Sequence, residues 1–191
     1  MKILCAADHK VMPWKNGAGS TTEIAVSPAG AGLDTFDWRV SMASVVEDGA
    51  FSAFPGIERT LAVLEGEGLV LEVEGRAPQT VLKDGVPASF PGDAPTRARL
   101  LSGPVVDLNV MTRRGRYAHR LRWQRIDAPT TLTPAEGALL LLARTSGLAV
   151  EGARLKAGDA VLLREPARLE TQGTGEFYLV ELWEAAGDLD K

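Results

Sequence analysis

The chain has 191 residues, of which 45% are hydrophobic, enough apolar material for one large domain or two small ones. No apolar run approaches the roughly 20 residues that span a bilayer, and the first residues lead directly into polar ones, so we expect a cytoplasmic protein without membrane contact. The single cysteine, Cys5, excludes an intramolecular disulfide, and the net charge of -4 argues against nucleic acid as a partner.

Apolar and polar residues alternate along most of the chain, which predicts β-strands. The clearest alternation lies at residues 21–26, 38–43 and 68–73, between turns rich in Gly, Pro and Asp. Residues 139–143 are uniformly apolar, but the segment is short and Ser146-Gly147 follows it, so we predict a buried strand rather than a helix. Many short strands without a long amphipathic helix indicate an all-β sandwich or barrel.

The second half of the chain weakly repeats the first. The matching segments, in the same order, are residues 68–75 with 147–152, Gly92-Asp93-Ala94 with Gly158-Asp159-Ala160, and residues 103–108 with 175–180. This repeat is typical of a duplicated jelly roll. We therefore predict an N-terminal half of residues 1–115 and a C-terminal half of residues 116–191, packed as one unit without a flexible linker.

The segment from Pro13 to Glu23 contains a tryptophan followed by two glycines. A dinucleotide-binding loop would need a helix after it, and a P-loop would need Lys-Ser/Thr after its last glycine, so neither kind of phosphate site is present. Two interpretations remain. The segment is either a glycine turn covered by Trp14 or a ligand loop in which Lys15 and Asn16 donate hydrogen bonds.

Arg39 lies among large apolar residues in the predicted strand 38–43. The alternation places Arg39 and Ser41 on one face of this strand and the apolar side chains on the other. The face that carries Arg39 is either solvated, which is the default for arginine, or lines a cavity where the guanidinium holds a carboxylate. Arg59 lies at the start of a further predicted strand. Phe51 and Phe54 precede it in the sequence, and we expect these two side chains to fill the core.

A second group of arginines lies between residues 113 and 125, with Tyr117 and Trp123 interleaved as in nucleic-acid-binding proteins. The alternation, however, places His119, Leu121 and Trp123 on a buried side and Arg120, Arg122 and Gln124 on a wet side. Together with the acidic net charge, this pattern favours a solvated strand face.

His9 and His119 are the only histidines, and they lie far apart in the sequence. A histidine-rich metal centre cannot be built from them, so we predict neither a metal nor a cofactor. No Ser-His-Asp or Cys-His arrangement is recognisable. Glutamates at positions 23, 58 and 65 could perform acid–base chemistry, but no spacing selects a pair.

Three sequence blocks, residues 13–19, 38–43 and 51–59, resemble the HutD family, also called HutD/Ves, in order and in position. The resemblance spans nearly the whole chain and is densest over residues 10–70. It implies a cupin-like (RmlC-like jelly-roll) double barrel, a bicupin, without the usual metal ligands. It also implies an association with histidine utilisation and a regulatory role, with an acidic pathway metabolite such as formylglutamate or urocanate as ligand.

An anionic ligand requires positive charge and neutral hydrogen-bond donors, which favours the cavity interpretation of Arg39. The candidate ligand-binding residues are Trp14, Lys15, Asn16, Thr22, Glu23, Arg39, Ser41, Ser52 and Arg59. We expect a small anionic metabolite as the partner, no nucleic acid and no membrane, and the sequence leaves a homodimer open. A metal-free isomerase or hydrolase is the alternative to a binding protein, and an interaction module is the third interpretation.

Overall fold

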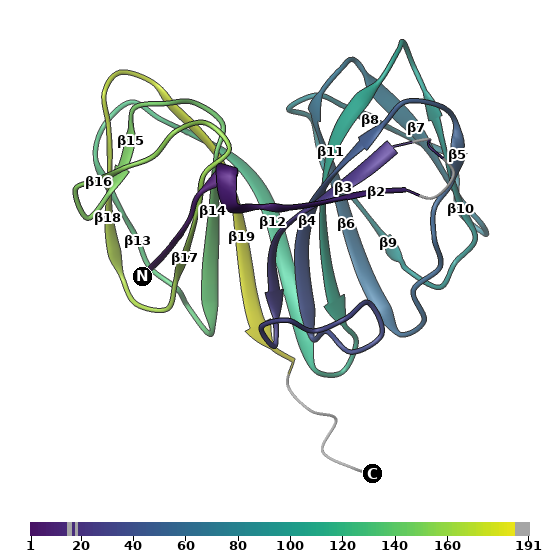
Figure 1. Ribbon diagram of the computed structural model, residues 1–191, viewed down its shortest axis with the longest axis horizontal. Coiled ribbons are helices and arrows are strands. Elements are labelled where there is room, and N and C mark those ends of the chain that lie inside the picture. The colour runs from purple at the N-terminus through teal and green to yellow at the C-terminus, as the bar shows by residue number, and fades with distance from the viewer. Residues whose placement is uncertain (15–16, 18, 186–191) are drawn as a thin grey trace. The chain divides into compact units, whose positions relative to one another are not determined.

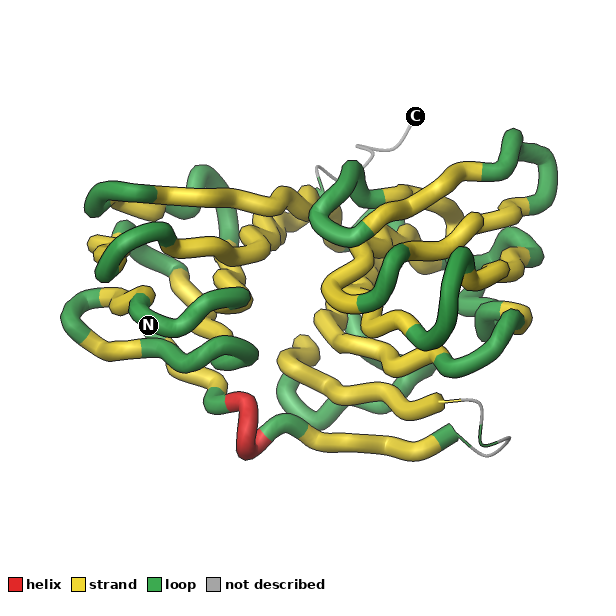
Figure 2. Tube along the Cα trace, turned by 90° about the horizontal axis from the view of Figure 1, so that it is seen from above, coloured by secondary structure: helices red, strands yellow, loops and turns green. Residues whose placement is uncertain are grey.

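The computed structural model describes residues 1–14, 17 and 19–185. These residues form strands β1 to β19 and one short 3-10 turn, Ala6–Asp8. Figure 2 shows strands and loops in all the described residues except this turn. The prediction of an all-β chain is therefore confirmed. No helix in the described part of the chain is long and apolar enough to cross a membrane.

The described residues divide into two compact units. The N-terminal unit is Lys10–Tyr117, and the C-terminal unit joins Met1–His9 to the segment that begins at Ala118. The first strand, β1 (Lys2–Leu4), therefore belongs to the C-terminal unit. It pairs there with β17 (Ala160–Leu163), and Ile3 lies opposite Val161.

The N-terminal unit contains two antiparallel sheets (Figure 1). The six-stranded sheet has the order β2 (Lys10–Pro13), β3 (Gly19–Ser27), β4 (Trp38–Val45), β11 (Val105–Arg113), β6 (Ile57–Glu65) and β9 (Ala88–Pro91). The four-stranded sheet has the order β5 (Gly49–Ala50), β10 (Thr96–Leu100), β7 (Gly68–Val73) and β8 (Gln79–Leu82). Apolar side chains of both sheets, including Leu61, Leu71 and Phe90, form one core cluster.

The C-terminal unit also contains two sheets. The five-stranded sheet has the order β1, β17, β14 (Ala138–Ala143), β19 (Gly175–Glu184) and β12 (Tyr117–Ile126). The four-stranded sheet has the order β13 (Thr130–Leu132), β18 (Ala167–Thr171), β15 (Leu148–Val150) and β16 (Ala153–Arg154). Every residue of β14 is buried, which confirms the prediction of a buried strand at residues 139–143.

The two units share one topology. The order β4-β11-β6-β9 of the N-terminal unit corresponds to β12-β19-β14-β17, and β5-β10-β7-β8 corresponds to β13-β18-β15-β16. The sequence repeat therefore reflects a duplicated jelly roll, and its matches of β7 with β15 and of β11 with β19 are confirmed.

The match between the two Gly-Asp turns is wrong. Gly158-Asp159 precedes β17, the counterpart of β9, whereas Gly92-Asp93 follows β9. A Gly-Asp turn suits the end of many strands, so this short signal carries little information on register. Asp159 has a local role instead, because its carboxylate accepts hydrogen bonds from the backbone N–H groups of Ala6 and Lys156, both at 2.8 Å.

Candidate functional site

The inner face of the six-stranded sheet carries polar side chains at positions where a barrel core is normally apolar. In the register of β4 and β11, Arg39 lies opposite Met111, Ser41 opposite Asn109 and Ala43 opposite Asp107; across β11 and β6, Met111 lies opposite Arg59. Paired residues on neighbouring strands share a face, and side chains two residues apart share it as well. One face therefore collects these polar residues: Arg39, Ser41, Arg59, Asp107 and Asn109.

These five residues line a cavity of about 630 Å³ in the N-terminal unit. Apolar and aromatic side chains contribute much of the remaining wall, among them Trp14, Leu33, Val45, Phe51, Phe54 and Met111. The combination of a mostly apolar wall with a few converging polar groups is typical of small-molecule sites, whose volumes run from roughly 300 to 1,000 Å³. The cavity is therefore large enough for a metabolite.

Arg59 is the most deeply enclosed cation of this cavity, with 4% of its surface exposed. The centre of its guanidinium lies 4.8 Å from the ring of Phe51, 5.5 Å from Phe54 and 5.1 Å from Phe90. It donates one hydrogen bond to Asn109 Oδ1 at 2.8 Å and another to the backbone oxygen of Ser52 at 3.3 Å. Burial lowers the pKa of Arg59 to about 10, so the group remains charged at neutral pH.

Asp107 and Asn109 extend this polar chain along β11. Asn109 Nδ2 donates to Asp107 Oδ1, so Asn109 stands between the carboxyl group and Arg59. Asp107 is completely buried, and its Oδ2 atom has no hydrogen-bond partner among the described residues. Burial raises the pKa of Asp107 to about 7, and the positive charge of Arg59 opposes this rise only in part. The carboxyl group therefore exchanges its proton near neutral pH.

Arg39 has a direct counter-ion. Its Nε donates to Glu23 Oε2 on β3 at 2.8 Å, and the Arg39 side chain is almost fully buried. Within residues 1–14, 17 and 19–185, neither terminal nitrogen of Arg39 has a hydrogen-bond partner. These two nitrogens form the planar pair of donors that a carboxylate accepts bidentately.

The structure brings together five of the nine candidate residues. Trp14, Arg39, Ser41, Ser52 and Arg59 all line the cavity, and Glu23 reaches it through its ion pair with Arg39.

Thr22 is directed elsewhere, because it pairs with Met42 and the side chains of this register lie on the opposite face of the sheet. Its neighbour Thr21 lines the cavity instead, and the Thr21 hydroxyl accepts a hydrogen bond from Trp14 Nε1 at 2.8 Å. Lys15 and Asn16 lie outside the described residues.

Asp107 and Asn109 were missed by the sequence analysis, as was the contact of three phenylalanine rings with Arg59. A signal for the two polar residues was present, since Asp107 and Asn109 alternate with valine and leucine in β11 just as Arg39 and Ser41 alternate with apolar residues in β4. Phe51 and Phe54 were expected to fill the core, and they do pack at its edge, but they also enclose a cation.

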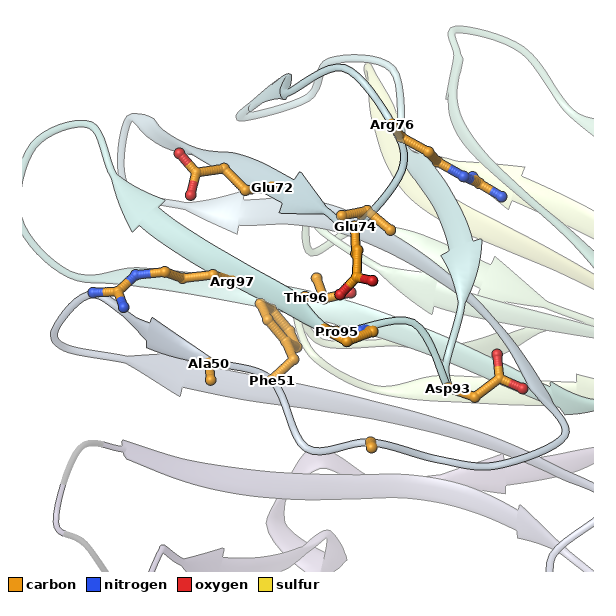
Figure 3. Close-up of a pocket in the computed structure, with 11 residues that line it drawn as sticks. Ala50, Phe51, Glu72, Glu74, Arg76, Asp93, Pro95, Thr96 and Arg97 are labelled. Atoms are coloured by element: carbon orange, nitrogen blue, oxygen red, sulfur yellow. The ribbon is translucent and has the colours of Figure 1, made fainter.

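A second hollow of about 570 Å³ lies beside the four-stranded sheet (Figure 3). The side chains of Glu72 and Arg97, which neighbour each other across β7 and β10, are exposed. Asp93 pairs with Arg114, and Arg76 donates to the backbone oxygen of Ser89 at 2.9 Å. Exposed charges of both signs are strongly screened by water, so this hollow is a weaker candidate for selective binding than the cavity lined by the buried Arg39 and Arg59.

The C-terminal unit has an apolar core at the equivalent level of its barrel. β19, the counterpart of β11, contributes Phe177 and Leu179 to this core, and β14 contributes Leu139 and Leu141. The polar interior thus distinguishes the N-terminal unit. In the described part of the chain, no three His, Cys, Asp or Glu side chains gather closely enough to hold a metal ion.

The duplicated jelly-roll topology gives the chain a cupin-like, double-barrel fold. A cupin 2 conserved barrel domain protein from Leptotrichia buccalis has a similar fold, with a TM-score of 0.55 at 13% identity over 84% of this chain and 87% of that one.

A family model described as HutD matches residues 6–179, and the chain belongs to this family. An uncharacterized 21.2 kDa protein in the hutC 3' region of Pseudomonas putida is 37% identical over 190 residues, covering 95% of this chain and 97% of that protein. Protein Ves of Citrobacter koseri is 42% identical over 119 residues, covering 60% of this chain and 61% of that protein.

Two solved structures are similar over nearly their full length. A conserved protein of unknown function from Pseudomonas aeruginosa PAO1 has a TM-score of 0.85 at 37% identity, covering 95% of this chain and 98% of that one. HutD from Pseudomonas fluorescens SBW25, in a formate condition, has a TM-score of 0.81 at 33% identity, covering 97% and 99% of the two chains.

Proposed function

We propose that the chain is a metal-independent binding protein that holds a small anionic metabolite in the cavity of its N-terminal unit. The observation that carries this proposal is the pair of buried arginines, Arg39 and Arg59, on the cavity wall. Buried polar groups are unfavourable unless they have hydrogen-bond partners. Arg39 is paired with Glu23 through Nε alone, and within the described residues its terminal nitrogens and the buried Nε of Arg59 have no partner. An anionic ligand would supply that partner.

The role of binding is regulation of histidine utilisation, with an acidic metabolite of that pathway as the ligand. The family and the relative found in the hutC 3' region support this assignment. Formylglutamate and urocanate both carry a carboxylate that the two arginines could hold. The polar wall residues Ser41 and Asn109 would add neutral contacts.

A thermal-shift screen with formylglutamate, urocanate, glutamate and histidine tests the proposal. A ligand present at a hundred times its dissociation constant stabilises the native state by about 2.7 kcal/mol, which raises the melting temperature measurably. We expect formylglutamate or urocanate to produce this shift and Arg39→Ala to abolish it. The absence of any shift with all four compounds would contradict the assignment to this pathway.

A metal-free isomerase or hydrolase is the second candidate function. It is favoured by Asp107, a cavity-lining carboxyl group with a raised pKa, because such groups occur often at catalytic sites. Incubation of each compound with the protein, followed by proton NMR, would detect a product. Turnover that disappears in Asp107→Asn would support an enzyme. If the compounds are unchanged after prolonged incubation, the enzyme hypothesis fails and the binding function remains.

A further inference from the structure

We propose that Asp107 takes part in binding as a neutral carboxylic acid whose Oδ2–H donates a hydrogen bond to the anionic ligand, so that the protein takes up one proton when it binds. This inference rests on the proposed function and assigns a role within the same cavity. It involves no covalent step. The proton comes from the solvent and resides on Asp107 Oδ2 in the complex.

The geometry leaves Oδ2 of this cavity-lining residue buried and, within the described residues, without a partner. Asp107 lies between Ala43 on β4 and Val63 on β6, neither of which has a polar side chain. Its Oδ1 atom already accepts from Asn109 Nδ2. Oδ2 is buried without a partner among residues that the structure describes, although Asp107 lines the cavity. A group bound in the cavity is therefore the partner that this oxygen lacks.

Burial favours the neutral form of Asp107, and the positive charge of Arg59 opposes it only in part. Asn109 lies between Arg59 of β6 and the carboxyl group in the hydrogen-bond chain, and Arg39 on β4 is paired with Glu23 of β3. Glu47 and Asp48, which follow β4, add negative charge to the cavity wall. The remaining residues of the wall are uncharged: Pro13, Trp14, Thr21, Leu33, Ser41, Ala43, Val45, Gly49, Ala50, Phe51, Ser52, Phe54, Ala98, Asn109 and Met111.

An anionic ligand strengthens this preference. The carboxyl group has a pKa near 7 before any ligand is present, because burial penalises its charged form. A further negative charge in the same cavity repels the carboxylate and raises its affinity for a proton. The protonated acid then offers a donor to the ligand, whereas the ionised form would repel it.

Calorimetry with formylglutamate tests the coupling, because its carboxyl groups are fully ionised above about pH 6 and add no titration of their own. Titrations at pH 8 in two buffers with different ionisation enthalpies measure the protons exchanged. We expect an uptake of about 0.9 proton per ligand, and a dissociation constant that increases about 25-fold between pH 6.5 and pH 8.5. Binding without proton uptake would overturn the inference while supporting the proposed function.

Asp107→Asn provides the matching variant, because an amide is neutral at every pH and can donate from the same position. We expect this variant to bind formylglutamate with an affinity that is nearly constant from pH 6.5 to pH 8.5. Glu72→Gln, which removes an exposed carboxylate outside the cavity, should keep the full pH dependence. Loss of binding in Asp107→Asn at every pH would show that the ionised carboxylate is required and would overturn the inference.

The protonation of Asp107 can also be measured without a ligand. Carbon-13 NMR of the carboxyl groups, with Asp107→Asn to assign the signal, should show a titration midpoint near 7. A midpoint below about 5 would contradict a neutral acid at this position. If formylglutamate does not bind at all, its assignment as the ligand fails, and the NMR midpoint still decides whether Asp107 is a neutral acid.

Discussion

The substitution Arg59→Met tests whether Arg59 binds the ligand or only stabilises the fold. Methionine keeps an unbranched apolar side chain among the three phenylalanine rings and removes the charge. In the folded protein, burial lowers the pKa of Arg59 from its usual value to about 10, which corresponds to about 3 kcal/mol of destabilisation of its charged form. The substitution relieves this unfavourable contribution.

The same substitution also removes favourable contacts. Asn109 Oδ1 loses its donor, which costs about 1–3 kcal/mol, and the contacts of the cation with the rings are worth roughly 1–2 kcal/mol. The gain and the losses nearly cancel. We therefore expect the free energy of unfolding to change by less than about 2 kcal/mol, while the affinity for formylglutamate falls at least tenfold, or about 1.4 kcal/mol.

Urea unfolding and calorimetry measure the two quantities, and Arg113→Met is the matched control. Arg113 donates to the backbone oxygens of Phe36 and Asp34, both at 3.0 Å, and its guanidinium lies 5.9 Å from the Phe36 ring, but it does not line the cavity. We expect this control to retain ligand affinity. A loss of more than about 3 kcal/mol of stability in Arg59→Met, with unchanged affinity, would refute a binding role for Arg59.

Three further predictions concern other positions. Arg39→Lys keeps the positive charge but loses the planar, bidentate guanidinium, so calorimetry should show ligand binding weakened by about 1.5–3 kcal/mol with the fold preserved. Arg39→Ala should weaken binding further. If both variants bind the ligand as tightly as the unsubstituted protein, Arg39 has only a structural role. Replacing both Arg120 and Arg122 by glutamine removes two exposed ion-pair partners of Glu181 and should leave ligand affinity unchanged, because both side chains lie outside the cavity. A large loss of ligand affinity would place the binding face on β12 instead. Burial lowers the pKa of His119 to about 4, so its neutral form is favoured in the folded state and the free energy of unfolding should fall as the pH decreases from about 6.5 to about 4. His119→Gln should reduce this acid sensitivity in urea unfolding curves, and an unchanged pH profile would contradict the assignment.

The fold class, the strands and the duplication could be read from the sequence because each depends on local patterns. A period of two identifies a strand without knowledge of its partner, and the exposure of Arg120 and Arg122 on β12 follows the predicted alternation. The repeat aligned β7 with β15 and β11 with β19, since each pair retains several apolar positions. The Gly-Asp turns were misaligned because two residues hold too little information to define a register.

The environment of each strand face required the tertiary structure. Alternation shows that Arg39 and Ser41 share a face of β4, but it cannot tell whether that face meets water or a cavity. Both faces of β4 are in fact enclosed, since Trp38 and Val40 on one side and Arg39 on the other are all buried. From the sequence around Arg39 alone, a solvent-exposed side chain was therefore a reasonable expectation. Only the packing of the strands in the tertiary structure shows that this side chain is buried.

The sequence by itself determined that segments such as 38–43 and 139–143 form strands, which residues of such a segment share a face, and that the chain is a duplicated all-β protein. The tertiary structure decided that β4, β11 and β6 are neighbours, which brings Arg39, Arg59 and Asp107 to one cavity although they are distant in sequence. It also decided that β1 pairs with β17 in the C-terminal unit. Pairings of this kind arise from long-range packing and chain connectivity, for which a single sequence contains no local signal.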